Sequence, residues 1–263
     1  EVSDRRGQEK CDQAIAENAE FAQWAAKERR DNDNHMIAAM FGGHATFTLS
    51  DETMDKMAEA NNGLTGFHIH VCEGMNDVWD SRLNRGGISP VERLLQHNLL
   101  GPDTMLGHCI HVTPAEMDIV KESGTWLVNN PESNMGNAVG CAPVLEFFRR
   151  GIPVCLGSDG MASNNNHNLF HDMYLQALIY KGATLDPTAV TPQQALAAAT
   201  RTGALSQGRT DCGMVAEGAR ADLCVLDITD PSWCPAPDPV YNLVYAGDGA
   251  DVVLTMCDGR VIY

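Results

Sequence analysis

Positive charge is scarce in this 263-residue sequence, which has 18 Lys and Arg residues against 35 Asp and Glu residues and a net charge of −17. Nucleic acids and anionic membrane surfaces both favour Lys and Arg, so this shortage argues against either as a partner. The sequence also lacks a signal peptide and any apolar run long enough to cross a bilayer. We therefore expect a cytoplasmic protein that acts on a small neutral or cationic molecule.

A cysteine framework is also missing, although nine cysteines are present. Their number is odd, they are spread along the chain and no Cys-x-x-Cys pair occurs, which argues against disulfides and fits a reducing cytosol. The absence of Pro-Cys-x-x-Cys disfavours the kind of zinc site in which this motif accompanies His-x-Glu. An initiator Met is absent as well, so we expect a processed or partial chain.

What the sequence does contain is a regular alternation of short apolar runs and amphipathic segments. After a helix over residues 8–31, the predicted strands cover residues 36–41, 65–71, 105–111, 125–128 and 153–156. The predicted helices between and after them include one that begins after Ser50 and others over residues 90–97, 114–123, 142–150, 169–180 and 191–199. This order predicts successive parallel βαβ units, in either a doubly wound sheet or a barrel, with ligands at the carboxyl ends of the strands.

The alternation of predicted strands and helices stops after Gly203. Residues 218–227 and 251–263 read as strands, with turns and a Pro-rich stretch over residues 231–239 between them and no helix. We therefore predict two domains, an α/β domain over residues 1–207 and a small all-β appendage over residues 208–263.

The run His68-Ile-His70-Val-Cys-Glu73 is the most specific signal of chemistry. Residues two apart in a strand point to the same face, so the two histidines project together. Neutral imidazoles bind divalent metals, and a carboxylate just past the strand end can move protons at a metal site. A lone His-x-His pair also occurs as ordinary core histidine, and the following glutamate is what favours a site.

Three further polar residues lie at predicted strand ends: His108, Asp159 and His44. Two of them have an ordinary structural alternative, since Asp159-Gly160 is a common turn and His44 could be a loop histidine. All four signals nevertheless fall where α/β folds gather their ligands, which favours one shared site.

Together these motifs resemble the amidohydrolase superfamily, in its branch of deaminases and triazine chlorohydrolases (the ATZ/TRZ-like enzymes). The resemblance covers nearly the whole chain, and the run over residues 130–140 most resembles SsnA-type aminohydrolases. The segments that carry it are FGGH (41–44), HIHVCE (68–73), GHCIH (107–111), NNPESN (129–134), LGSDGMASNN (156–165) and the tail GARADLCVLD (218–227).

The resemblance implies one divalent metal ion, zinc or iron, at the mouth of a (β/α)8 TIM-type barrel. It implies that His70, His108 and Asp159 belong to the metal site and that Glu73, Asp159 and His108 are catalytic. Glu73 would shuttle protons, and Asp159 would also be the base for a metal-activated water. His44, Glu73 and His108 would contact the substrate.

One part of the family pattern is missing. The family's first barrel strand ends in a His-x-His pair that supplies two more ligands, and no such pair precedes His68. The resemblance therefore implies an incomplete barrel, about strands 4 to 8, followed by part of a small β-sandwich. His68 shares the motif without being expected as a direct ligand.

The implied activity is hydrolysis of a C–N bond other than a peptide bond, above all deamination of a heterocyclic amine of the purine, pterin, pyrimidine or triazine type. A chlorohydrolase or cyclic-amide hydrolase would use the same residues, and a non-catalytic relative without the first His pair is a third reading. The partner expected is a small heterocyclic substrate, and homo-oligomerisation is left open.

Overall fold

The computed structural model describes residues 1–32, 35–235 and 237–263. The chain divides into two compact units, one comprising Glu1–Val128 with Arg150–Ile152 and the other Asn129–Arg149 with Pro153–Tyr263. Each unit is described by itself. Among the described residues, no helix combines the length and the apolar character that a membrane crossing requires.

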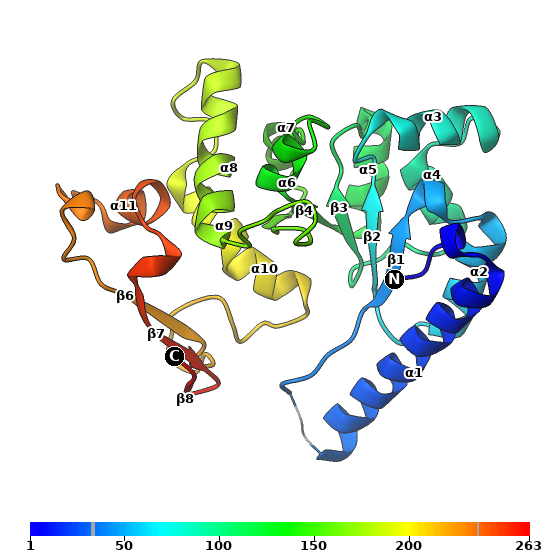
Figure 1. The fold of residues 1–263 in the computed structure, drawn as a ribbon, viewed down its shortest axis with the longest axis horizontal. Helices are drawn as coiled ribbons and strands as arrows, with labels where there is room; N and C mark the ends of the chain where they lie inside the picture. Colours follow the sequence, from blue (N-terminus) through cyan, green and yellow to red (C-terminus); the bar gives the residue numbers. More distant parts are fainter. Residues whose placement is uncertain (33–34, 236) are drawn as a thin grey trace. The chain divides into compact units, whose positions relative to one another are not determined.

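The first unit is built on parallel strands that follow one another in chain order. They are β1 (Phe41–Ala45), β2 (Phe67–Val71), β3 (Met105–His108) and β4 (Trp126–Asn129), shown in Figure 1. The pairing places Phe41 opposite Phe67, and His70 opposite Gly107. Buried side chains such as Phe41, Ile69 and Leu106 fill the core beside these strands. The predicted run of parallel βαβ units is confirmed here.

Helices connect these strands, and their first residues explain where several of them begin. The first unit contains η1 (Asp4–Arg6), α1 (Gln8–Asn32), η2 (Thr46–Thr48), α2 (Asp51–Asn61), α3 (Met75–Asn84), α4 (Pro90–Gln96) and α5 (Pro114–Ser123). Ser50 caps α2, as predicted, by accepting the Thr53 N–H at 3.2 Å. Ser89 and Thr113 form capping boxes at α4 and α5, each with a proline at the first turn. Helix α3 was not predicted.

The first predicted strand is wrong in its position. Residues 36–40 lie outside any strand, and β1 begins at Phe41 and includes the Gly42-Gly43-His44 segment that was read as a loop. Gly43 suits its place in the strand because neighbouring side chains approach it closely. A Cβ on Gly43 would lie 2.9 Å from Met57 Cε and 3.1 Å from Ile69 Cγ1. A glycine in a strand interior often marks such a close approach.

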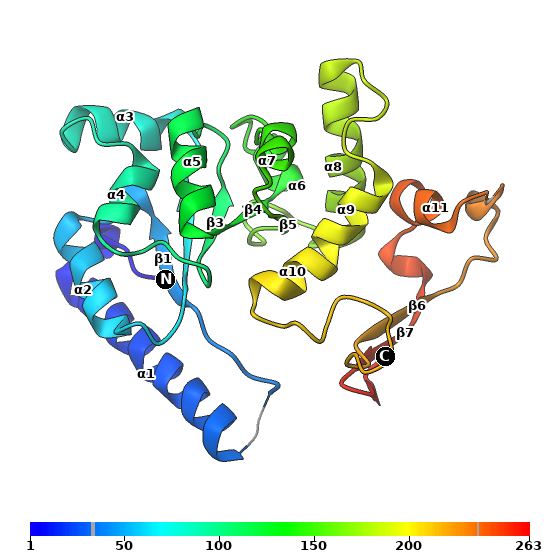
Figure 2. The same cartoon turned by 180° about the vertical axis from the view of Figure 1, so that it is seen from behind.

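The second unit begins at the last residue of β4. It contains α6 (Pro131–Gly136), α7 (Val144–Arg150), β5 (Val154–Leu156), α8 (Leu169–Thr184), α9 (Pro192–Ala199) and α10 (Arg201–Ser206). Gly157, just after β5, donates its N–H to the Asn129 carbonyl at 2.9 Å. Helix α9 packs against α8 and α10, as Figure 2 shows, and Met173, Ala177 and Ala195 lie in the core of this unit. Helices α6 and α10 were not predicted.

The C-terminal part of the second unit holds a small antiparallel sheet. Its elements are β6 (Leu223–Leu226), η3 (Pro231–Trp233), α11 (Pro239–Tyr245), η4 (Gly249–Asp251), β7 (Val252–Cys257) and β8 (Arg260–Val261). The predicted α/β class with a C-terminal β-structure is therefore confirmed. The expectation that no helix lies between these strands is wrong, because Asp238 caps α11 by accepting the Val240 N–H at 2.8 Å and Pro239 opens it. Residue 236 of the Pro-rich stretch lies outside the described residues, and the domain boundary at 207/208 stays a prediction.

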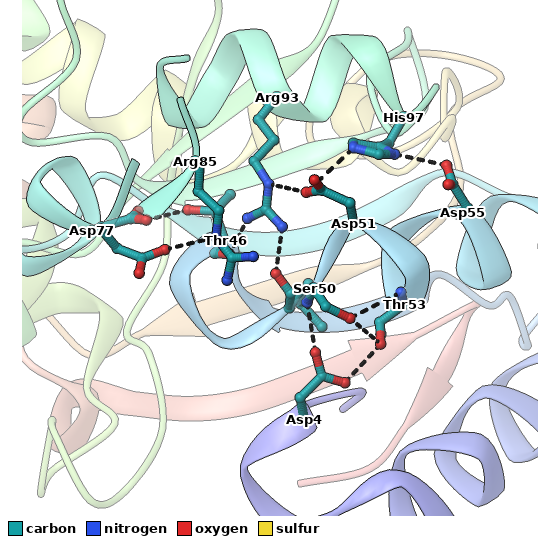
Figure 3. Close-up of polar contacts among 12 residues, drawn as sticks. Asp4, Thr46, Ser50, Asp51, Thr53, Asp55, Asp77, Arg85, Arg93 and His97 are labelled. Carbon is teal, nitrogen blue, oxygen red and sulfur yellow. Dashed lines mark hydrogen bonds and ion pairs between the residues drawn. The ribbon is translucent and has the colours of Figure 1, made fainter. Parts of the chain in front are cut away.

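A buried arginine fixes the loop that follows β1. The Arg93 side chain is 2% exposed and donates to the Thr46 carbonyl, the Leu49 carbonyl and Asp51 Oδ1, each at 2.6 Å (Figure 3). The guanidinium fork thus satisfies the Leu49 carbonyl and adds a second donor to the Thr46 carbonyl, which also accepts the Leu49 N–H at 3.4 Å.

We predict that Arg93→Met lowers the free energy of unfolding by about 3 kcal/mol, because it takes the donor from the Leu49 carbonyl, removes one of two donors to the Thr46 carbonyl and breaks the ion pair with Asp51. Urea denaturation at neutral pH measures this change. Arg149→Met is the matched control, since the Arg149 side chain is 70% exposed and pairs only with Glu146, and it should change the free energy by less than about 1 kcal/mol. Equal losses in the two variants would contradict the assignment.

Candidate active site

Two histidine rings meet at the carboxyl ends of β2 and β3. His70 Nδ1 lies 3.1 Å from His108 Nε2, and the ring centroids are 5.1 Å apart. His70 is half-buried in β2, whereas the His108 side chain is 1% exposed. The strand register explains the meeting, because His70 pairs with Gly107 and Val71 pairs with His108.

The backbone after β3 turns sharply to present His108. Both His108 and Cys109 have positive φ, at 68° and 49°, which is uncommon for residues other than glycine. The turn is held by Cys109, whose N–H donates to the Val71 carbonyl at 3.0 Å. Unusual backbone held by its surroundings is concentrated at functional sites.

The spacing of the two nitrogens fits a shared metal ion. Two nitrogens that bind one tetrahedral zinc ion at about 2.0–2.1 Å lie roughly 3.3–3.4 Å apart. The observed separation of His70 Nδ1 and His108 Nε2 is 3.1 Å. Imidazole is a ligand that suits both zinc and iron. The donor set of the first unit is therefore compatible with a divalent ion of the predicted kind.

A carboxylate lies beside the histidine pair. Glu73 follows β2, and its Oε2 is 3.9 Å from His108 Nε2. That distance is too long for a hydrogen bond and short enough for an ion pair when the imidazole is protonated. The predicted His70, Glu73 and His108 thus lie together in the first unit.

His44 lies on the other side of His70, with ring centroids 5.8 Å apart. Its Nδ1 is 3.0 Å from the Thr48 hydroxyl. Burial lowers the pKa of His44 below its ordinary value of 6.5, and the negative charge of Glu1 opposes this shift only in part. His44 is therefore a neutral imidazole at neutral pH, able both to donate and to accept a hydrogen bond.

Glu1 is a neighbour of the site that the sequence analysis did not identify. Its Oε1 lies 3.5 Å from His70 Nε2. The hydrogen bond with His70 is the largest cause that lowers the Glu1 pKa to about 2. Val2 brings Glu1 there by bridging β1: its N–H donates to the Gly42 carbonyl at 2.8 Å and its carbonyl accepts from His44. An isolated β-bridge formed by one residue has no periodic sequence pattern, so it could not be predicted from the sequence.

Asp159 lies in the second unit, just after β5. Its Oδ2 accepts the Ser133 hydroxyl at 2.6 Å, and its Oδ1 accepts the Gly160 N–H at 2.8 Å. The φ of Asp159 is 62°, a left-handed conformation that aspartate tolerates better than most residues. Ser133 is fully buried in α6, so its hydroxyl fixes the direction of this carboxylate.

A buried aspartate joins the loops around Asp159 within the second unit. Asp172 accepts the Glu132 N–H at 3.0 Å and the Asn164 side-chain N–H at 3.1 Å. Asn164 in turn accepts the backbone N–H of Asn166 and that of His167, and so shapes the loop after β5. Asp172 was missed because it lies inside a helix, with no motif to mark it.

A second buried aspartate, in the first unit, was also missed. The Asp77 side chain accepts the Cys72 N–H at 2.6 Å and the Thr46 hydroxyl. Burial raises the pKa of Asp77 from its ordinary value of 3.8 to about 6, although both hydrogen bonds act in the opposite direction.

Comparisons with known proteins bear on what these residues do. A sequence model described as the amidohydrolase family matches residues 2–262. The 5'-deoxyadenosine deaminase of Methanosarcina mazei is 37% identical over 259 residues, which are 97% of this chain and 58% of that protein. The 5-methylthioadenosine/S-adenosylhomocysteine deaminase of Acetivibrio thermocellus is 35% identical over 231 residues, 87% of this chain and 53% of that protein.

A solved structure agrees with these sequence matches. The crystal structure of an adenosine deaminase from Xanthomonas campestris with bound zinc superposes with a TM-score of 0.87 at 29% identity, covering 95% of this chain and 56% of that one. The chain thus spans a little over half the length of the relatives it matches. These matches agree with the predicted family resemblance and fold class.

We predict a pH-dependent effect of Asp77→Asn on stability. The folded protein holds a proton on Asp77 more tightly than the unfolded chain does, since its pKa is about 6 in place of 3.8. The stabilisation from the protonated form is therefore complete below about pH 4 and lost as the pH rises through about 6. Relative to the wild type, the asparagine variant should gain up to about 3 kcal/mol between pH 4 and pH 7.

Urea denaturation of both proteins across this range checks the prediction. Only the difference between the two unfolding free energies matters, because other groups titrate equally in both. A difference that stays constant with pH would show that Asp77 has an ordinary pKa.

Proposed function

The chain belongs to the amidohydrolase family, and from that premise we propose that it carries the catalytic half of a metal-dependent deaminase of heterocyclic amines. The observation that carries the proposal is the pair of imidazole nitrogens 3.1 Å apart with the Glu73 carboxylate beside them. Sequence identities of 37% and 35% to two deaminases, over 97% and 87% of this chain, support the same proposal.

We propose His70, His108 and Asp159 as the residues of this chain that hold one divalent ion, zinc or iron. Two imidazoles and a carboxylate are a donor set that suits either metal. When bound, such an ion polarises a water molecule and lowers its pKa towards neutrality. The Ser133 hydroxyl supports this role by orienting the Asp159 carboxylate.

Two residues of this chain, Asp159 and Glu73, carry out the proton transfers. Asp159 accepts a proton from the attacking water, and the water oxygen forms a bond to the ring carbon that bears the amino group. Protonated Glu73 delivers its proton to the adjacent ring nitrogen. It then takes the remaining hydroxyl proton as the ring carbonyl forms and passes that proton to the departing amine, so that ammonia leaves; return of the proton held by Asp159 to Glu73 completes the cycle. His108 contacts the attacked centre, and neutral His44 lines the substrate pocket.

Adenine nucleosides are the first substrates that we propose. The relatives are described as deaminases of 5'-deoxyadenosine, 5-methylthioadenosine, S-adenosylhomocysteine and adenosine. All of these molecules share the amino group of adenine, which a hydrolytic deaminase replaces by a carbonyl. The strong negative charge of the protein is compatible with an uncharged nucleoside.

We predict that, in the complete gene product that contains this chain, Glu73→Gln lowers kcat for adenosine deamination by a factor of about 10²–10⁴, because a positioned proton carrier is lost. Asp159→Asn should abolish turnover, because it removes the base and a proposed ligand together. Ammonia release measures both effects, and metal content separates them: Glu73→Gln should keep the metal that Asp159→Asn loses.

His97→Gln serves as the control, since His97 pairs with Asp55 and has no proposed role. A substrate panel with a chlorotriazine and a cyclic amide tests the two related reactions. Release of chloride or ring opening without ammonia would replace deamination by one of these. Wild-type turnover in Asp159→Asn would contradict the proposed site altogether.

A further inference from the structure

One buried carboxylate joins the loops that follow β1 and β2. Asp77 lies in the first turn of α3, and its side chain is 1% exposed. One oxygen accepts the Cys72 N–H at 2.6 Å. The other accepts the hydroxyl of Thr46, which lies beside Asp77 in Figure 3. An ionised carboxylate only accepts hydrogen bonds, so both of its buried oxygens need these donors.

Cys72 is the residue immediately before Glu73, and its backbone is unusual. Its φ is 50°, in the left-handed region, which costs on the order of 1 kcal/mol or more for a residue with a side chain. Its carbonyl accepts the N–H of Ile110 at 3.1 Å and that of His111 at 3.0 Å. Asp77 therefore completes the set of bonds that hold this turn, and the turn sets the direction in which the chain presents Glu73.

The second bond of Asp77 reaches η2, the short helix that directly follows β1 and His44. Thr46 is fully buried at the start of η2, and its carbonyl accepts from Arg93 at 2.6 Å. Thr48, in the same short helix, lies with its hydroxyl 3.0 Å from His44 Nδ1. A carboxylate that holds Thr46 and Cys72 at once therefore fixes the distance between the two loops.

We infer that Asp77 is a positioning residue: through the Cys72 amide it fixes the proton shuttle Glu73, and through Thr46 it ties that shuttle to η2, the short helix that follows His44 and β1. This inference rests on the proposed function, in which Glu73 carries protons. It concerns a residue outside the metal site, which touches neither the substrate nor the proposed ligands.

Asp4 offers a matched comparison in the same unit. It also accepts one backbone N–H, from Ser50 at 2.5 Å, and one threonine hydroxyl, from Thr53 at 2.6 Å. These bonds tie η1 to the start of α2 and do not involve the Glu73 loop. A loss of activity that reflects general stability should therefore appear in Asp4→Ala as well.

The test is a double-mutant cycle on the complete gene product, measured by ammonia release from adenosine. Asp77→Ala should lower kcat tenfold or more in the wild-type background. In the Glu73→Gln background the same change should lower kcat less than threefold, because the shuttle that it positions is already disabled. A general structural role would give equal losses in both backgrounds, and that result would overturn the inference.

Asp77→Asn is the control for the case in which Asp77→Ala does not fold. The asparagine oxygen can accept from Cys72 while its amide donates to the Thr46 hydroxyl, which can act as an acceptor. We therefore expect this variant to keep kcat within threefold of the wild type. A loss as large as that of the alanine variant would contradict positioning by hydrogen bonds.

Hydrogen exchange read by mass spectrometry tests the same inference without turnover. Peptides covering residues 44–49 and 71–75 should exchange faster in Asp77→Ala and remain unchanged in Asp4→Ala. Unchanged exchange in Asp77→Ala would overturn the inference even in an active enzyme. Failure of the proposed function would appear differently, as a parent protein that releases no ammonia.

Discussion

The close approach of His70 and His108 is the constraint on which the rest of the site depends. Two imidazole nitrogens 3.1 Å apart can share one proton or face one cation, but two protonated rings at this distance would repel each other. The parallel register of β2 and β3 makes the approach possible, because it brings His70 and His108 to the same edge of the sheet. Of the neighbouring groups, Glu73 lies in the loop that follows β2, and His44 lies in β1.

Buried aspartates hold those loops, one in each unit. Asp77 joins the loops after β1 and β2 in the first unit, and Asp172 joins the segments that begin at Glu132 and Asn164 in the second. A buried carboxylate is costly unless its oxygens are satisfied, and each of these accepts two hydrogen bonds from different segments. The loops that carry the functional side chains are therefore fixed by charge placed in the interior, at some expense of stability.

The sequence predicted what depends on local pattern and missed what depends on contacts between distant residues. The shared face of His68 and His70 follows from the two-residue period of a strand, and the helix predicted over residues 114–123 is α5. The place of Gly43 in β1 could not be predicted, because its need for a small residue comes from the packing of Met57 and Ile69, which are distant in sequence. Asp77 has no sequence signal at all, since its partner Thr46 lies 31 residues away.

The central claim, that His70, His108 and Asp159 hold one divalent ion, is tested most directly by titrating the complete gene product with Co²⁺ and following its visible absorption. The account predicts saturation at one equivalent, affinities at least tenfold weaker in His70→Gln and in Asp159→Asn, and no change in His97→Gln. Titration curves for His70→Gln and Asp159→Asn that overlay the wild-type curve would contradict it.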